Sequence, residues 1–264
     1  MAKQLIIVLS GKKQSGKNTL ANFIIGSYLV RTNQIPSFVI TQKGLLKIPL
    51  SYDQQPIEQP DMSDMSIIEQ NMSVIVPEGD FNNCGFQGIK LYSFAEPLKS
   101  FCMEVLGLTY EQCYGTDEVK NTFTACRWNN VSEDIKEKNG RFSGLMRARA
   151  VMQVFGTDMV RTMLNDAWPI ATYKKIKKEK MELAIVTDAR FPNEIKIGET
   201  SAISIRLMRD ICRKDSHPSE IALDDYKEFD KIFDNRITTI EEQNKMVKPF
   251  LDDLFKKYFG NKDD

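Results

Sequence analysis

The chain has 264 residues, enough for a substantial core, and its 36 Lys plus Arg residues equal its 36 Asp plus Glu residues. This balance excludes a global basic field that would gather nucleic acid or an anionic membrane, so any phosphate binding must be local. No apolar run approaches the ~20 residues of a membrane span, and the five cysteines form no Cys-x-x-Cys pair, which is typical of reduced thiols. We therefore expect a cytoplasmic protein without stable nucleic-acid binding and without a membrane partner.

The most informative segment is residues 11–19, which read GKKQSGKNT and follow the apolar run at residues 5–9. A helical pattern begins directly after it. A strand, a glycine-bounded loop and a helix in this order present backbone N–H groups to an anion, and one lysine follows the phosphates. The hydroxyl that usually follows this lysine arrives one residue late, at Thr19, in a form typical of nucleoside monophosphate kinases. The segment predicts a nucleoside triphosphate site, and the alternative is an ordinary glycine turn before a helix.

The next segments predict an insertion and a second strand-to-helix unit. The first helix should run to about residue 30, and residues 31–88, with scattered prolines, predict an excursion from the core with short strands at 37–40 and 72–76. A core strand at 89–94 leads into a helix that has proline in its first turn. Lys99 lies in that turn, where it could meet a phosphate; the alternative is a solvated lysine.

Residues 145–160 predict one helix. Arg149, Gln153 and Thr157 are spaced i, i+4, i+8 and share a face beside Gly156. A guanidinium and an amide at this spacing suit a phosphate and a base edge, and the alternative is an exposed polar face with a packing glycine. The apolar side chains expected to pack inward are Met152, Phe155 and Met159.

The apolar run at 182–187 predicts a buried parallel strand that ends at Asp188 and Arg190. Ligands of open α/β sheets lie beyond the carboxyl ends of the strands, so this carboxylate and guanidinium lie where a metal and a phosphate would bind. A purely structural contact between the two is the alternative. Because His217 is the only histidine, schemes that need paired histidines are excluded.

Further strands are expected at 202–207 and 231–235, followed by a helix capped by Thr239 that runs to residue 255 with a start or kink at Pro249. The order of elements predicts an α/β fold of the P-loop NTPase type, with three α/β/α layers and a mostly parallel central sheet. We expect a single domain over residues 1–264 with an inserted segment at about 31–88.

Five segments in order resemble the bacteriophage deoxynucleoside monophosphate kinases: residues 11–19, FAEPLK at 94–99, MQVFGTD at 152–158, DARFPNE at 188–194 and HPSE at 217–220. The resemblance covers most of residues 1–30 and 89–240. It implies a phosphotransferase with a phosphate group as acceptor, which moves the γ-phosphoryl group of ATP with Mg²⁺ to a deoxynucleoside monophosphate (dNMP) to give ADP and dNDP. In a phage-encoded protein this reaction would take place in the host cytoplasm.

The resemblance also implies roles for particular residues. Departures from the family pattern are Asn18, where aspartate is common, and Ala150, where a second basic residue is common. Arg206, Arg209 and Arg213 are candidates for mobile charges that close over ATP. The catalytic candidates are Lys17, Arg149, Asp188 and Arg190; those for the donor nucleotide are Gly11, Ser15, Gly16, Lys17, Asn18, Thr19 and Arg209. Those for the metal are Thr19 and Asp188, directly or through water, and those for the acceptor are Lys13, Lys99, Lys120, Arg149, Gln153, Gly156, Thr157, Trp168, Asp188, Arg190 and Glu194.

Two other functions fit the same loop. One is a different P-loop small-molecule kinase, such as a phosphomevalonate or dephospho-coenzyme A kinase. The other is a nucleotide-gated interaction protein that docks through the excursion at 31–88. The accepted bases, the discrimination against ribonucleotides and the formation of a homodimer are left open by the sequence.

Overall fold

The computed structural model describes residues 4–48, 74–75, 85–196, 202–210 and 221–260. The chain divides into two compact units. The first, here called the sheet unit, comprises Met1–Tyr92 and Glu179–Asp264, and the second, here called the helical unit, comprises Ser93–Lys178. The expected single domain with an insertion stays a prediction, and the HPSE segment and Arg213 lie outside the described residues.

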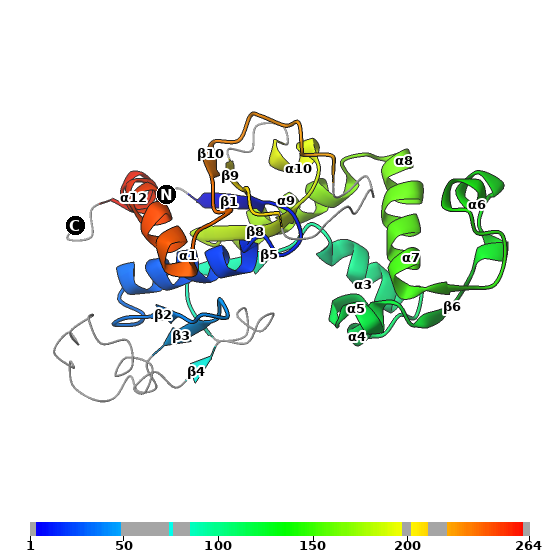
Figure 1. The fold of residues 1–264 in the computed structure, drawn as a ribbon, viewed down its shortest axis with the longest axis horizontal. Coiled ribbons are helices and arrows are strands. Elements are labelled where there is room, and N and C mark those ends of the chain that lie inside the picture. The colour runs from blue at the N-terminus through cyan, green and yellow to red at the C-terminus, as the bar shows by residue number, and fades with distance from the viewer. Residues whose placement is uncertain (1–3, 49–73, 76–84, 197–201, 211–220, 261–264) are drawn as a thin grey trace. The chain divides into compact units, whose positions relative to one another are not determined.

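The sheet unit is built on five parallel strands in the order β10-β9-β1-β8-β5 (Figure 1). Every residue of β1 is buried, and so are the first four of β8, which explains why both strands read as continuous apolar runs. The α/β class and the parallel central sheet predicted from the sequence are confirmed. The strands are β1 (Leu5–Ser10), β5 (Ile89–Tyr92), β8 (Leu183–Ala189), β9 (Ala202–Leu207) and β10 (Lys231–Phe233).

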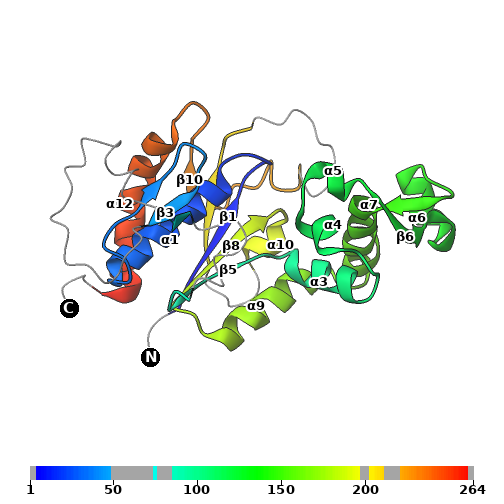
Figure 2. The ribbon, with the colours of Figure 1, turned by 90° about the horizontal axis from the view of Figure 1, so that it is seen from below.

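Two long helices of the sheet unit, α1 (Lys17–Arg31) and α12 (Ile240–Phe259), lie side by side (Figure 2). The ring of Tyr28 packs edge-on against Phe255 and Phe259, at centroid distances of 6.3 and 5.7 Å. As expected, Thr239 caps α12 in a capping box with Glu242. The helix continues through Pro249 to Phe259, so the predicted end at residue 255 is four residues short. A short helix, α10 (Pro192–Ile195), follows β8.

The segment after α1 forms a second, antiparallel sheet of three short strands, β2 (Val39–Ile40), β3 (Leu46–Ile48) and β4 (Val74–Ile75), in that order. The predicted strands at 37–40 and 72–76 correspond to β2 and β4, although the ends of the second lie outside the described residues. The sequence did not predict β3. The hairpin of β2 and β3 joins the main core through Leu46, which is fully buried, and through Ile40 and Ile48, which pack against it.

The helical unit has its own core, in which Trp128, Met146 and Val151 are buried with two cysteines, Cys102 and Cys113. Burial raises the pKa of the Cys102 thiol to about 12, so this group stays protonated at neutral pH. The elements are α3 (Glu96–Glu104), α4 (Tyr110–Tyr114), α5 (Asp117–Lys120), β6 (Phe123–Arg127), a 3₁₀ turn (Trp128–Asn130), α6 (Glu133–Asn139), β7 (Leu145–Arg147), α7 (Ala148–Gln153), a π-helical segment (Val154–Val160), α8 (Arg161–Met163) and α9 (Ala167–Glu179).

The prediction of one helix over 145–160 is wrong at its start, and the helical segment continues to Met163, three residues past the predicted end. The first three residues form β7, which pairs with β6 across a long sequence separation, and a helix begins only at Ala148. From Val154 the backbone widens into a π-helix, a form that a 3.6-residue periodicity does not reveal. Met159 is 41% exposed, so its predicted inward packing is also wrong. Among the helices of the described chain, none is long and apolar enough to cross a membrane.

Candidate functional site

The loop between β1 and α1 forms a cradle that only glycine permits at two positions. A Cβ at Gly11 would lie 2.3 Å from Ser15 Oγ, and Gly16 has φ +95° at the N-cap of α1, in the left-handed region. Ser15 is fully buried, and its hydroxyl has no hydrogen-bond partner within the described residues. An unpartnered buried hydroxyl inside a loop of this shape fits a ligand that brings its own acceptors.

Lys17 lies across this loop. Its ammonium group donates hydrogen bonds of 2.8 Å to the carbonyl oxygens of Gly11 and Lys12. The pKa of Lys17 is lowered to about 8, chiefly by burial and then by the charges of Arg190 and Arg206, while the charge of Asp188 opposes them. Two arginines and the carboxylate of Asp188 therefore act on the charge of Lys17, although Arg206 is itself paired with Asp224. The lowered pKa of Lys17 means that its positive charge is disfavoured until an anion binds beside it.

The register of the sheet explains why these charges meet. Ser10 ends β1 and pairs with Ala189 of β8 on one side and with Arg206 of β9 on the other. Asp188 and Arg190 flank Ala189, so the carboxyl ends of three adjacent strands bring them to the start of the loop (Figure 2). The sheet thus brings Asp188 and Arg190 close to Lys17, and their predicted roles stay predictions.

Arg206 is anchored at the base of the loop. Its guanidinium donates a hydrogen bond of 2.9 Å to Ser10 Oγ and lies 3.5 Å from the carboxylate of Asp224. The same carboxylate accepts a hydrogen bond of 2.6 Å from Lys12. With a side chain only 12% exposed, Arg206 is part of this network in the structure, and its suggested role as a mobile charge stays a prediction.

Glu194 supports the turn after β8. It is 3% exposed, and its carboxylate accepts hydrogen bonds from the backbone N–H groups of Arg190 at 2.6 Å and Phe191 at 3.1 Å. Pro192 begins α10, which makes Glu194 the third residue of that helix and explains how it reaches back to the turn. Glu194 therefore positions the backbone that carries the exposed Arg190 side chain.

Two site residues escaped the sequence analysis: Asn235 and Gln243. Both are buried. The side-chain amide of Asn235 donates to the carbonyl oxygen of Ser15 at 2.8 Å and to Gln243 Oε1 at 2.7 Å. Its Oδ1 accepts from the backbone N–H of Arg209 at 2.8 Å. Asn235 could have been identified as a site residue from its position just beyond β10, at the ligand-binding edge of a parallel sheet.

Arg209 is held by the segment that follows β10. Its guanidinium donates to the carbonyl oxygen of Asn235 at 2.9 Å, and also to that of Thr238. These contacts fix Arg209 behind the phosphate loop in this structure. Lys13 and Asn18, by contrast, are exposed on the loop and on the first turn of α1.

Thr19 lies against the β2–β3 hairpin. A Cβ at Gly44 would be 2.2 Å from Thr19 Oγ1, and the side chain of Asn22 donates a hydrogen bond of 2.8 Å to the carbonyl oxygen of Gly44. The excursion after α1 therefore packs on the first two turns of that helix. Among the described residues, no group of three or more His, Cys, Asp or Glu side chains could hold a metal ion.

The helical unit carries the remaining predicted residues. Lys99 Nζ lies 4.1 Å from the centroid of the Tyr114 ring, within cation–π distance. Arg149 forms an ion pair of 2.8 Å with Asp117, the first residue of α5. Lys120, at the end of the same helix, is half-buried. Three predicted cations thus lie on α3, α5 and α7, and Arg149 is paired with a carboxylate that an anionic ligand would have to replace.

Trp168 is tied to the π-helical segment. Its indole N–H donates a hydrogen bond of 3.0 Å to the carbonyl oxygen of Gly156, which is buried against Leu98. The ring of Phe155 lies between Trp168, at a centroid distance of 6.4 Å, and Phe101, with which it stacks at 4.4 Å. The nearby predicted residues Gln153 and Thr157 are half-buried.

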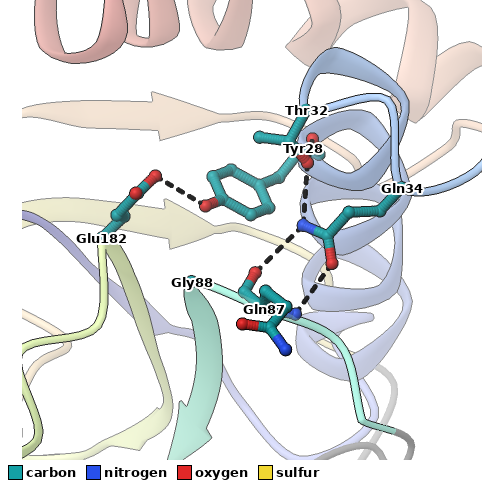
Figure 3. A pocket seen from close by; sticks show the side chains of 6 residues that line it. All are labelled: Tyr28, Thr32, Gln34, Gln87, Gly88 and Glu182. Carbon is teal, nitrogen blue, oxygen red and sulfur yellow. Dashed lines mark hydrogen bonds between the residues drawn. The ribbon is translucent and has the colours of Figure 1, made fainter.

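A cavity of about 220 Å³ lies at the opposite edge of the sheet (Figure 3). Glu182 and Gly88 directly precede β8 and β5, so the cavity is at the amino ends of the strands, away from the ligand-binding edge. Its polar groups are hydrogen-bonded to one another, as in the 2.9 Å bond from Tyr28 to Glu182. We assign it a structural role. Its lining residues are Tyr28, Thr32, Gln34, Gln87, Gly88 and Glu182.

A parallel sheet with a glycine-bounded, lysine-bearing loop between β1 and α1 defines a protein of the P-loop NTPase-like class. No family model matches the chain. It is 32% identical over 165 residues to an Acanthamoeba polyphaga mimivirus protein assigned to the deoxynucleotide monophosphate kinases, a match that covers 57% of this chain and 76% of that protein. It is also 32% identical over 65 residues to the deoxynucleoside-5'-monophosphate kinase of Escherichia phage T5, which covers 24% of this chain and 25% of that protein. The chain belongs to the deoxynucleotide monophosphate kinase family.

Proposed function

We propose that this protein transfers the γ-phosphoryl group of ATP to the α-phosphate of a deoxynucleoside monophosphate, giving ADP and a deoxynucleoside diphosphate. The observation that carries the proposal is the position of Lys17 across the phosphate loop, where its ammonium group donates to the carbonyl oxygens of Gly11 and Lys12 and lies close to the charges of Arg190 and Asp188. A phosphate group that enters this site would remove the repulsion among the cations.

The donor half of the site would be the loop itself. Backbone N–H groups of the loop and of the first turn of α1 would bind the phosphates, together with the buried hydroxyl of Ser15. Lys17 would exchange its hydrogen bonds to Gly11 and Lys12 for phosphate oxygens. Asn18 and Arg209 complete the residues that we assign to this half.

Hydroxyl and carboxylate oxygens are ligands that suit Mg²⁺. Asp188 is close enough to Lys17 to raise the pKa of that lysine, which supports its place at the phosphates. We propose that Thr19 and Asp188 hold the ion, the second through water, and that it neutralises charge on the donor phosphates.

The acceptor half would contribute positive charge rather than a general base, because a phosphate oxygen is already ionised at neutral pH. We propose that Arg190 or Arg149 neutralises the acceptor phosphate, and that Glu194 acts by fixing the turn that carries Arg190. Gln153 and Trp168 would contact the base. The other residues assigned to the acceptor are Lys13, Lys99, Lys120, Gly156 and Thr157.

The test is a coupled assay of ADP release with ATP, Mg²⁺ and each dNMP and NMP in turn. The proposal expects turnover with several dNMPs, and a decrease of orders of magnitude in Lys17→Ala with an unchanged circular dichroism spectrum. A rate in Lys17→Ala close to that of the unmodified protein would contradict it. Turnover of a single small-molecule phosphate and of no dNMP would instead favour another P-loop kinase.

A further inference from the structure

The phosphate loop is supported from behind by Asn235. This residue lies two positions after the end of β10, is fully buried, and uses every polar atom of its side chain. One amide group donates both to the carbonyl oxygen of Ser15 and to Gln243 Oε1, and Oδ1 accepts from the backbone of Arg209. A single side chain therefore connects the loop, helix α12 and the segment after β9.

The bond to Ser15 fixes the direction of a peptide group that a phosphate would contact. The peptide unit is planar and trans, so the carbonyl oxygen of Ser15 and the N–H of Gly16 point in opposite directions. Because Asn235 holds the carbonyl oxygen of Ser15, the N–H of Gly16 is directed away from Asn235. Gly16 has φ +95°, a conformation that the flexible residue glycine could leave easily without such a restraint.

Gln243 supports Asn235 from the first turn of α12. It is 2% exposed, and its Oε1 would be 3.4 Å from a Cβ placed on Gly16, so both amides pack directly beneath that glycine. The orientation of Gln243 is in turn fixed by its bond from Asn235. Because Gln243 Nε2 is buried and has no hydrogen-bond partner within the described residues, the bond from Asn235 to Oε1 is the contact that orients this amide.

We infer that Asn235, oriented by Gln243, is a positioning residue that holds the phosphate loop in its anion-binding conformation before the nucleotide arrives. This inference rests on the proposed function. It adds that part of the affinity for ATP comes from a side chain that does not contact the phosphates. Without Asn235 the Ser15–Gly16 peptide can rotate, and the N–H group has to be reoriented at each binding event. Removal of Asn235 should therefore weaken the binding of ATP and leave the binding of the acceptor unchanged.

The experiment compares Asn235→Leu, Gln243→Met and a matched control, Ser204→Ala. Leucine and methionine are neutral and close in volume to the residues they replace, so charge near the phosphates does not change. Ser204 is as fully buried as Asn235 and also exchanges hydrogen bonds with a distant residue, Asp230, but it lies in β9 and does not contact the loop. Each variant is examined by calorimetric titration with ATP, by steady-state kinetics for both substrates and by thermal unfolding.

We expect Asn235→Leu to raise the Kd for ATP about tenfold, the equivalent of one hydrogen-bonded restraint. The KM for the dNMP at saturating ATP should stay within about twofold. Gln243→Met should show the same selective effect at about threefold, and it decides the question if Asn235→Leu does not fold. Ser204→Ala should lower the melting temperature and leave the Kd for ATP unchanged.

An ATP Kd within about twofold of the unmodified value in the folded variants would overturn the inference, as would an equal effect in Ser204→Ala. The proposed function fails by a different result, namely an unmodified protein that binds ATP and phosphorylates no dNMP. In that case the calorimetric comparison still tests the role of Asn235, because it requires no acceptor.

Discussion

Arg206 donates a hydrogen bond of 2.9 Å to the hydroxyl of Ser10, the last residue of β1 before the phosphate loop. Its guanidinium also lies 3.5 Å from Asp224, the carboxylate that binds Lys12 on the loop itself. One largely buried arginine of β9 thus contacts the end of β1 directly and is connected to Lys12 of the loop through Asp224. This connection makes the position of the loop depend on β9 as well as on β1.

Arg206→Ala should raise the KM for ATP about tenfold and change the KM for the dNMP by less than twofold. The expected magnitude is that of one charge-assisted hydrogen bond to a buried partner. Steady-state kinetics with each substrate varied in turn measures it. Lys196→Ala is the control, because it removes one cation of the same unit that pairs with Glu228 on the surface. Equal losses in the two variants would show that only net charge matters.

Glu194→Ala should lower the free energy of unfolding by about 2–3 kcal/mol, since it leaves two backbone N–H groups without their carboxylate acceptor. Urea titration measures this change. Glu194→Gln, which retains one carbonyl oxygen, should cost less. Because Glu194 fixes the turn that carries Arg190, Glu194→Ala should also raise the KM for the dNMP more than the KM for ATP. A variant with unchanged stability would refute the supporting role of Glu194.

Trp168→Phe separates two roles of the indole. It removes the N–H that binds the carbonyl oxygen of Gly156 and keeps an aromatic ring, so it should cost about 1–2 kcal/mol of stability. The KM for the dNMP should hardly change. Trp168→Leu, which also removes the ring, should raise that KM if the ring stacks on the base. If both variants gave the same KM as the unmodified protein, Trp168 would have only a structural role.

Nucleotide binding should be coupled to proton uptake near pH 8. In the free protein the pKa of Lys17 is lowered to about 8, so about half of these lysines are neutral at pH 8. A bound phosphate favours the charged form and raises this pKa, so binding at pH 8 should take up about 0.5 proton. At pH 6 Lys17 is already protonated, so its contribution to the proton uptake should vanish. Calorimetry in buffers of different ionisation enthalpy measures both values, and equal uptake at the two pH values would contradict the assignment.

The sequence predicted the elements whose signals are local. The apolar run of β1 and the glycines of the loop predicted the first strand, the loop and α1, all within about thirty residues. In the same way Thr239 predicted the start of α12. The positions of Asp188 and Arg190 beside the loop also followed from a local signal, because the carboxyl ends of parallel strands meet at one edge of a sheet.

What the sequence did not reveal depends on contacts between distant residues. Asn235 binds Ser15 across 220 positions, and nothing in its neighbours marks the bond. The strand β7 exists because it pairs with β6, and the helical periodicity of residues 145–160 hid it. The π-helical segment likewise cannot be recognised from the spacing of apolar residues, although Gly156 lies within it.

The most direct test of the proposed phosphoryl transfer follows the γ-phosphoryl group itself. The protein is incubated with Mg²⁺, one dNMP and ATP labelled at the γ-phosphorus, and the products are separated by chromatography, with Lys17→Ala in parallel. If the protein transfers the γ-phosphoryl group of ATP to a dNMP, the label appears as the β-phosphate of the dNDP with the unmodified protein and not with the variant. Label that appears only as inorganic phosphate, or that reaches the dNDP equally in Lys17→Ala, would contradict it.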